Sequence, residues 1–374
     1  MATVTQQVDS EFTERAGQFR RELFAHCYRM SGSVHEAEDL VQETYLRAWR
    51  AYHKFEERAS MRTWLHRIAT NVCLTALEGQ ARRPLPTGLG QPAADPGAPL
   101  SEPGEVPWLS PVPDALVAPG RSPESAAEQH EGVRLAFVAA LQHLPPRQRA
   151  ALVLRDVLQW RAAEVAEAVG TTTAAVNSAL QRARETVRSA ELSRDDTGGQ
   201  VGPEQQELLD RYVAAFWDKD VESLVAMFTD RAVWEMPPFP EWYQGPSDIV
   251  KLIGTKCPGG AHDMVMLPAR ANGQPAFGLY MRQADSTFVP FHLQVLTLDG
   301  AMVSHVGAFF DTSLFELFGL PTSLPADSRG SLPADSGGSL PVDSPGALPV
   351  GSEDSLTADA SPPTDPREAR APVR

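Results

Sequence analysis

Apolar positions in the first part of the chain recur with the period of a helix. One predicted helix, over residues 60–77, begins after Ser60, a favourable N-cap. Its apolar face consists of Met61, Leu65, Ile68 and Val72. A capping-box pair, Ser33 and Glu36, opens another helix that reaches about residue 52. No proline interrupts this part of the chain, so the pattern predicts an all-α domain over residues 12–83.

The periodic pattern stops between residues 84 and 131. This stretch is rich in proline and glycine, and it carries one arginine against seven acidic side chains. We therefore expect an acidic linker without a core of its own. A flexible chain of about 45 residues has a root-mean-square span of roughly 35–40 Å, and prolines and net negative charge favour a more extended form.

Helical spacing returns over residues 132–191, where two apolar stripes flank Gly170. The first stripe consists of Ala162, Val165, Ala166 and Val169, and the second of Val176, Leu180, Ala183 and Val187. Thr171 or Thr172 is placed to cap the second helix. Two short helices joined by a glycine-containing turn predict a helix-turn-helix, the second helix of which fits the major groove of DNA.

The segment over residues 204–320 predicts a mixed α+β domain. Two helical stretches, over about 205–217 and 220–228, precede runs that alternate as strands do. Asn272-Gly273 and Asp299-Gly300 each separate two such runs, which predicts two hairpins.

The last segment, residues 321–374, contains an octapeptide repeat (SLPADSRG, SLPADSGG, SLPVDSPG). Each unit is too short and too polar to bury a face, and proline and glycine oppose both helix and sheet. We expect a disordered acidic tail that is dispensable for folding.

Charge and cysteine content narrow the function. The formal net charge is −15, but residues 132–190 carry eight arginines against four acidic side chains, as a DNA-contacting segment would. Cys27, Cys73 and Cys257 lie in no metal-binding spacing, so we expect no metal, no cofactor and a reducing compartment. No stretch has the pattern of a signal peptide or a membrane span, which favours a cytoplasmic protein without membrane contact.

Three strings give the first half a family resemblance. DLVQETYLRAWRAY at 39–52 and FEERASMRTWLHRIATNVCL at 55–74 resemble region 2 of sigma-70 family RNA polymerase sigma factors of the extracytoplasmic-function group. LPPRQRAALVLRDVLQW at 144–160, with the helix-turn-helix after it, resembles their region 4. The resemblance covers about residues 1–191, and it is specific because both regions occur in this order with a linker between them.

The resemblance implies two functional faces in region 2. The helix that docks on the polymerase clamp would carry Asp39, Leu40, Gln42, Glu43 and Leu46. The element that melts and reads the −10 promoter region would carry Arg58, Arg62, Trp64, Arg67 and Asn71. Cations suit the phosphates of a melted strand and flat groups suit its bases, although Trp64 is equally well explained as a core residue.

Region 4 would read the −35 element from the second helix of the helix-turn-helix. Its candidates for base contact are Thr173, Ala174, Asn177, Ser178 and Gln181, which project away from the apolar stripe. Arg182 and Arg184 are expected on phosphate, a contact that positions without specifying sequence. Related factors commonly have a basic residue at the positions of Asn177 and Ala179, so this region 4 is expected to bind weakly or to prefer an unusual sequence.

The α+β segment resembles the SnoaL-like, polyketide-cyclase-like family. The strings LLDRYVAAFWDKDVESLVAMFTDRAVWEMPP and LQVLTLDGAMVSHVGAFFD carry the resemblance, which implies a sheet and helices that form a cone around a pocket. The candidate pocket residues are Trp234, Trp242, Tyr243, His262, Tyr280, His292 and Asp311. No motif joins two of them into a catalytic pair, and core aromatics with ordinary surface histidines are the alternative.

The combined interpretation is an alternative sigma factor and not an enzyme. Its expected partners are the clamp and flap of core RNA polymerase, promoter DNA, and an anti-sigma protein or small ligand. The fused domain would modulate it, either by opposing DNA binding through its negative charge or by bracing regions 2 and 4. The alternatives are a stand-alone helix-turn-helix regulator with a ligand-sensing domain and a SnoaL-type enzyme.

Overall fold

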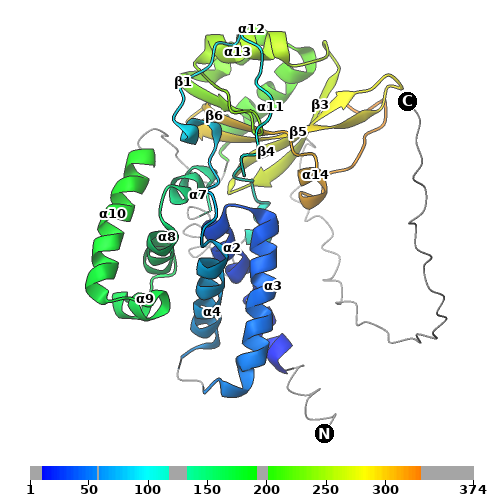
Figure 1. Ribbon diagram of the computed structural model, residues 1–374. Coiled ribbons are helices and arrows are strands. Elements are labelled where there is room, and N and C mark those ends of the chain that lie inside the picture. Colours follow the sequence, from blue (N-terminus) through cyan, green and yellow to red (C-terminus); the bar gives the residue numbers. More distant parts are fainter. Residues whose placement is uncertain (1–10, 57–58, 118–132, 192–200, 330–374) are drawn as a thin grey trace, which may run out of the picture. The chain divides into compact units, whose positions relative to one another are not determined.

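The computed structural model describes residues 11–56, 59–117, 133–191 and 201–329 (Figure 1). The predicted tail from residue 330 onwards, the end of the linker at 118–132 and the candidate DNA-contacting Arg58 lie outside these residues.

The first helical bundle confirms the all-α domain. Its helices are α2 (Arg20–Ser31), α3 (Val34–Ala51), the short 3-10 helix η1 (Tyr52–Lys54) and α4 (Met61–Ala76). Ser33 and Ser60 are the N-caps of α3 and α4, because their side chains accept hydrogen bonds from the backbone N–H groups of Glu36 and Thr63. On the predicted apolar face of α4 only Ile68 stays half-buried.

The second helical bundle contains the predicted helix-turn-helix. Its elements are α7 (Leu135–Gln142), α8 (Pro146–Leu152), the π-helical turn η3 (Val153–Val157), α9 (Ala162–Val169) and α10 (Thr173–Glu191). Gly170 ends α9 in the left-handed conformation, with φ of 68°. The side chain of Thr172 accepts a hydrogen bond from the N–H of Ala175 and so caps α10. The second predicted stripe is buried at all four positions.

The α+β domain is a six-stranded sheet covered on one face by three helices (Figure 1). The helices are α11 (Pro203–Asp218), α12 (Val221–Met227) and α13 (Pro246–Lys256). The strands are β1 (Phe228–Glu235), β2 (Trp242–Gln244), β3 (Met264–Ala271), β4 (Gln274–Arg282), β5 (Phe288–Asp299) and β6 (Met302–Phe309). Their order is β2-β1-β6-β5-β4-β3, and all neighbours are antiparallel except β1 and β6.

Both predicted hairpin turns are confirmed. Asn272 and Gly273, with φ of 57° and 73°, join β3 to β4. Along β5, side chains alternate between two cores: Leu296 packs with the helices α11–α13, while Leu293 and Val295 belong to the core formed with the helical bundles. The face of the sheet opposite its own helices, which we call the outer face, therefore contacts the sigma-like half of the chain.

The described part of the linker is ordered against neighbouring elements, although it has no core of its own. Residues 84–117 include the short helices η2 (Pro86–Leu89) and α5 (Asp114–Val117). The buried linker side chains include Leu85, Leu109, Val112 and Val117. Backbone groups of the linker also bond to other segments, as Ser110 N–H does to Gly32 O at 3.1 Å and Ala94 N–H to Trp242 O at 2.8 Å. The pattern of apolar residues did not predict this packing, because the apolar partners of the linker lie in neighbouring elements and not in the linker itself.

The expected boundary of the tail is also too early. After α14 (Leu314–Leu317), residues 321–329 still contact the sheet. Leu324 exchanges two backbone hydrogen bonds with Phe288, at 2.9 and 2.8 Å, and the Tyr280 hydroxyl donates to Pro321 O at 2.8 Å. The composition of residues 321–329 resembles that of the repeat. The stretch is nevertheless ordered, because the Leu324 side chain is buried and its backbone pairs with β5.

We predict that two truncations will separate these segments. A chain ending at residue 329 should keep the melting temperature of the full chain, whereas a chain ending at residue 320 should melt several degrees lower. The reason is the loss of the Leu324 side chain, whose burial contributes about 1.5–3 kcal/mol, and of its two backbone bonds. Thermal denaturation followed by circular dichroism measures both, and equal melting temperatures for the two truncations would contradict the assignment.

Candidate polymerase and promoter interfaces

The candidate clamp-binding residues of α3 divide between its two faces. Asp39, Gln42 and Leu46 are exposed, and Glu43 is half-buried and paired with Arg47 at 2.6 Å. Leu40 is buried in the helical core, so it supports α3 and is not on the docking face.

Trp49 extends the exposed face of α3 and was missed by sequence reasoning. Leu46 and Trp49 are 49% and 48% exposed, which is unusual for large apolar side chains. They follow Asp39 and Gln42 at spacings of four and three, so the four residues form one stripe of the helix. The same spacing in the sequence was the signal that could have identified Trp49.

The cations of α4 are engaged within the chain. The Arg62 guanidinium lies 2.5 Å from a carboxylate oxygen of Glu22. Arg67 lies 2.8 Å from the carboxylate of Glu167, which belongs to α9 of the second bundle. In this arrangement neither arginine presents an unpaired charge to DNA.

The two other candidates on α4 differ in exposure. Trp64 is half-buried and packs against Phe55 with ring centroids 4.8 Å apart. Asn71 is exposed, and its side-chain amide donates to Arg67 O at 2.9 Å.

The predicted reading face of α10 is exposed. The side chains of Thr173, Ala174, Asn177, Ser178, Gln181 and Arg182 are all exposed. Arg184 makes a bidentate ion pair with Asp156 at 2.8 and 2.6 Å, and this bond raises its pKa. Arg184 thus ties the recognition helix to the π-helical turn η3 in addition to any contact with phosphate.

A buried arginine joins the second bundle to the first. Arg149 of α8 is 4% exposed, and its guanidinium donates to Leu141 O, Gln142 O and Leu144 O at 2.9–3.3 Å and to Met30 O of α2. Burial lowers the pKa of Arg149 to about 10, so the side chain stays protonated at neutral pH. Carbonyl dipoles balance this charge, with no carboxylate among the hydrogen-bond partners seen in the described residues.

A single asparagine in the turn between β3 and β4 contacts three other segments. The Asn272 side chain is fully buried, and its oxygen accepts from Val112 N–H at 2.9 Å. Its amide nitrogen donates to the Tyr28 hydroxyl of α2 at 2.9 Å and to Val133 O, just before α7, at 2.6 Å. We call this arrangement the Asn272 junction. Sequence reasoning identified Asn272 only as a turn residue.

A buried glutamate forms a second contact between the sheet and the linker. Glu235 of β1 accepts from both the N–H and the hydroxyl of Thr87, at 2.9 and 3.2 Å. His305 of β6 lies 2.7 Å from the same carboxylate, and both side chains are buried. Neither residue was a candidate, since Glu235 lies in a strand-like run and His305 has no motif around it.

The predicted pocket residues of the α+β domain do not gather in one place. Trp234, Tyr243 and His292 are buried, with the first two in the core under the helices, whereas Tyr280 belongs to a separate cluster around Phe315. His262 is exposed beside Trp217, Trp242 lies over the linker with its N–H bonded to Gln91 O, and the Asp311 carboxylate accepts from Ser313.

The first half of the chain matches two family models. "Sigma-70 region 2" matches residues 16–83 and "Sigma-70, region 4" matches residues 134–187. The two helical bundles are therefore those of a sigma-70-type transcription initiation factor, in which region 2 contains α2–α4 and region 4 contains α7–α10.

Similar proteins extend beyond these two regions. The chain is 57% identical over 316 residues to SigG of Mycobacterium tuberculosis, an ECF RNA polymerase sigma factor, with 84% of this chain and 85% of that protein covered. It is 30% identical over 241 residues to SigJ of the same species, covering 63% and 69%. The crystal structure of SigJ matches 82% of this chain and 98% of that one, with a TM-score of 0.53 at 23% identity, which shows the same fold through the SnoaL-like domain.

This chain belongs to the ECF RNA polymerase sigma factors, and it carries a SnoaL-like domain fused behind region 4. It is an alternative sigma factor that acts with core RNA polymerase in promoter-directed transcription initiation. Within the described residues, no helix is long and apolar enough to cross a membrane.

We predict that Asn272→Ala will destabilise the chain by about 3 kcal/mol, because the Val112 N–H and the Val133 carbonyl lose the partner they have here. The Tyr28 hydroxyl loses one of its two bonds and keeps the one that it donates to Ser110 O. The left-handed backbone at this position adds to the cost for alanine. Thermal denaturation should show a melting temperature lower by several degrees. Asn177→Ala, on the exposed face of α10, is the matched control and should leave stability unchanged; equal effects of both substitutions would argue against the Asn272 junction.

Proposed function

We propose that the exposed stripe of α3 docks on the clamp of core polymerase and that region 4 contacts the flap. The stripe supports this because it combines the apolar Leu46 and Trp49 with the polar Asp39 and Gln42, the composition of a protein-binding surface. The complex would form in the cytoplasm, where the polymerase is.

We further propose that promoter reading divides between the two regions. Arg58, Arg62, Trp64, Arg67 and Asn71 would serve the −10 element, and Thr173, Asn177, Ser178 and Gln181 the base edges of the −35 element. The single observation that carries this proposal is the exposed row of polar side chains on α10, the second helix of the helix-turn-helix that turns at Gly170. Arg182 would contact phosphate, and Arg184 would do so while holding Asp156.

The described arrangement is proposed to be a closed resting form. The promoter elements are on the order of 20 base pairs apart, or about 65 Å at 3.4 Å per pair, and regions that pack through Arg149 do not span this distance. Opening would free Arg67 from Glu167 and expose the −10 face. The chain alone is therefore expected to bind promoters weakly and to gain affinity with core polymerase.

The SnoaL-like domain is proposed to brace this closed form and not to act as an enzyme. On the helix-covered side of the sheet, the Tyr212 hydroxyl donates to Gln294, whose amide contacts His292, each at 2.9 Å. Burial lowers the pKa of His292 to about 3, so it is neutral and far from the value near 7 that suits a general base. The ion-pair and hydrogen-bond partners of His292 among the described residues include no carboxylate. Turnover of a small molecule by the purified chain would favour the enzyme alternative.

We predict that Asn177→Ala and Gln181→Ala will change promoter choice at the −35 element, because a good bidentate base contact contributes about 1–3 kcal/mol of discrimination. Arg182→Ala should weaken all promoters alike, since phosphate contacts carry no sequence information. In vitro transcription from a promoter library with reconstituted holoenzyme measures both effects. Identical sequence preferences in all three variants would refute the assignment.

We predict that polymerase separates regions 2 and 4. Spin labels on Glu78→Cys and Thr171→Cys, both exposed, in a Cys257→Ser background would report the distance between the end of α4 and the turn of the helix-turn-helix. The distance should lengthen by tens of ångströms when core polymerase is added. A labelled pair within region 2, Glu78→Cys with the exposed Arg21→Cys of α2, is the control that should not change, and an unchanged distance between regions would contradict the closed form.

A further inference from the structure

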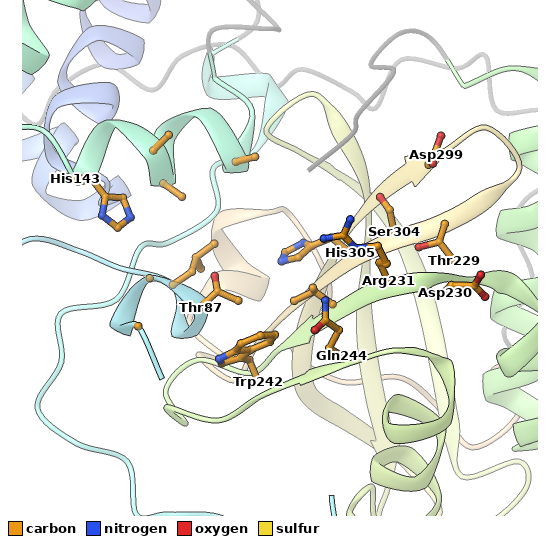
Figure 2. A pocket seen from close by; sticks show the side chains of 17 residues that line it. Thr87, His143, Thr229, Asp230, Arg231, Trp242, Gln244, Asp299, Ser304 and His305 are labelled. Atoms are coloured by element: carbon orange, nitrogen blue, oxygen red, sulfur yellow. The ribbon is translucent and has the colours of Figure 1, made fainter. Parts of the chain in front are cut away.

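A cavity of about 770 Å³ lies where the outer face of the sheet, helix α7 and the linker meet (Figure 2). Its walls come from β1, β2 and β6, from α7, and from the linker turn around η2. The volume falls within the range of roughly 300–1,000 Å³ that is usual for small-molecule sites. It is a different place from the helix-covered side of the sheet, where His292 and Trp234 are buried.

One side of the cavity is apolar and flat. Helix α7 contributes Ala136, Ala139 and Ala140, whose small side chains leave the space open. Trp242 lies across from them, and its N–H bonds to Gln91 O at 3.0 Å, which fixes the ring in the wall. This side suits a planar apolar group.

The other side carries a free positive charge. Arg231 of β1 lines the cavity, is exposed, and has no ion pair or hydrogen bond within the described part of the chain. Thr229, Gln244 and Ser304 line the cavity beside it as neutral hydrogen-bonding groups. An anionic group would gain a charge-assisted bond here.

The remaining charged groups limit the charge of the ligand. Asp230 and Asp299 line the same end of the cavity and oppose a multiply charged anion. Glu235 is buried and engaged by His305 and Thr87, and His143 on the α7 side is bonded to Arg82 at 3.1 Å. A single negative charge therefore fits better than a phosphate with two.

We propose that this cavity binds a small organic monoanion with a flat apolar body, of the aromatic carboxylate or sulfonate class. Such a ligand would touch the sheet, α7 and the linker at once, so it would hold them together. Its effect on the separation of regions 2 and 4 rests on the closed form proposed above, whereas binding itself does not.

The test uses 1-anilinonaphthalene-8-sulfonate, a fluorescent aromatic monoanion, with the full chain and neither polymerase nor DNA. We expect saturable fluorescence enhancement that Arg231→Gln weakens about tenfold, the equivalent of about 1.4 kcal/mol. Ala139→Phe should also weaken binding because the ring fills the apolar side. Arg211→Gln, an exposed arginine on α11 outside the cavity, is the matched control and should bind like the unmodified chain.

Competition defines the chemical class. 2-Naphthoate should displace the dye, and inorganic phosphate at the same concentration should not. No saturable binding, or binding that is unchanged in both Arg231→Gln and Ala139→Phe, would overturn the proposal, and displacement by phosphate would overturn its apolar part. The melting temperature of each variant is measured to ensure that the dye does not report unfolding. If Ala139→Phe does not fold, the result with Arg231→Gln decides the test.

A second measurement separates the ligand site from its consequence. With the spin-labelled pair at 78 and 171, saturating 2-naphthoate should raise the polymerase concentration needed to lengthen the distance. If the dye binds as expected but this concentration does not move, the site stands and its coupling to opening is wrong. If the distance never lengthens, the closed-form proposal fails and the binding result is unaffected.

Discussion

The arrangement of this chain depends on the buried amide of Asn272. One side chain satisfies a linker N–H, the Tyr28 hydroxyl of region 2 and a carbonyl at the start of region 4. Each of these groups is costly to bury unpaired, so the four segments are stable together only when all bonds form. The position also needs a left-handed backbone, which asparagine tolerates better than most residues. The hairpin turn and the junction between domains are thus two consequences of one residue.

Polar groups hold regions 2 and 4 together beside an apolar core that both regions share, and the polar contacts suit the separation proposed above. Arg149 is balanced by carbonyl dipoles that water can replace once the regions part. The ion pair between Arg67 and Glu167 adds little, since exposed pairs contribute about 0–1 kcal/mol, but it pairs the charge of Arg67, which is proposed to serve the −10 element.

Local patterns predicted the elements well and the contacts between domains poorly. Helix caps at Ser33 and Ser60, the turn at Gly170 and the hairpin at Asn272-Gly273 all follow from neighbouring residues, and all were predicted. The burial of Leu109 and Leu324 was not predicted, because the segments that cover them lie far away in the sequence. The contact between Glu235 and His305 was not predicted for the same reason. Both look like ordinary strand residues in the sequence, and Thr87, which bonds to Glu235, lies far away along the chain. Leu40 shows the opposite error: a motif suggested docking, whereas helical spacing alone would have put it in the core.

The position of the α3 stripe suggests how opening would be driven. Leu46 and Trp49 lie on the exposed face of α3, whereas Arg149 and Asn272 act on α2. Polymerase could therefore bind region 2 before any buried contact between domains breaks. Once it is bound, a second site for region 4 on the same enzyme benefits from an effective concentration in the millimolar range. Free DNA would not give this advantage, because Arg67 of region 2 is paired with Glu167 and is not available to hold the DNA first. The two contacts with polymerase would together compete with the buried contacts that hold regions 2 and 4. Promoter recognition would then follow opening and would not cause it.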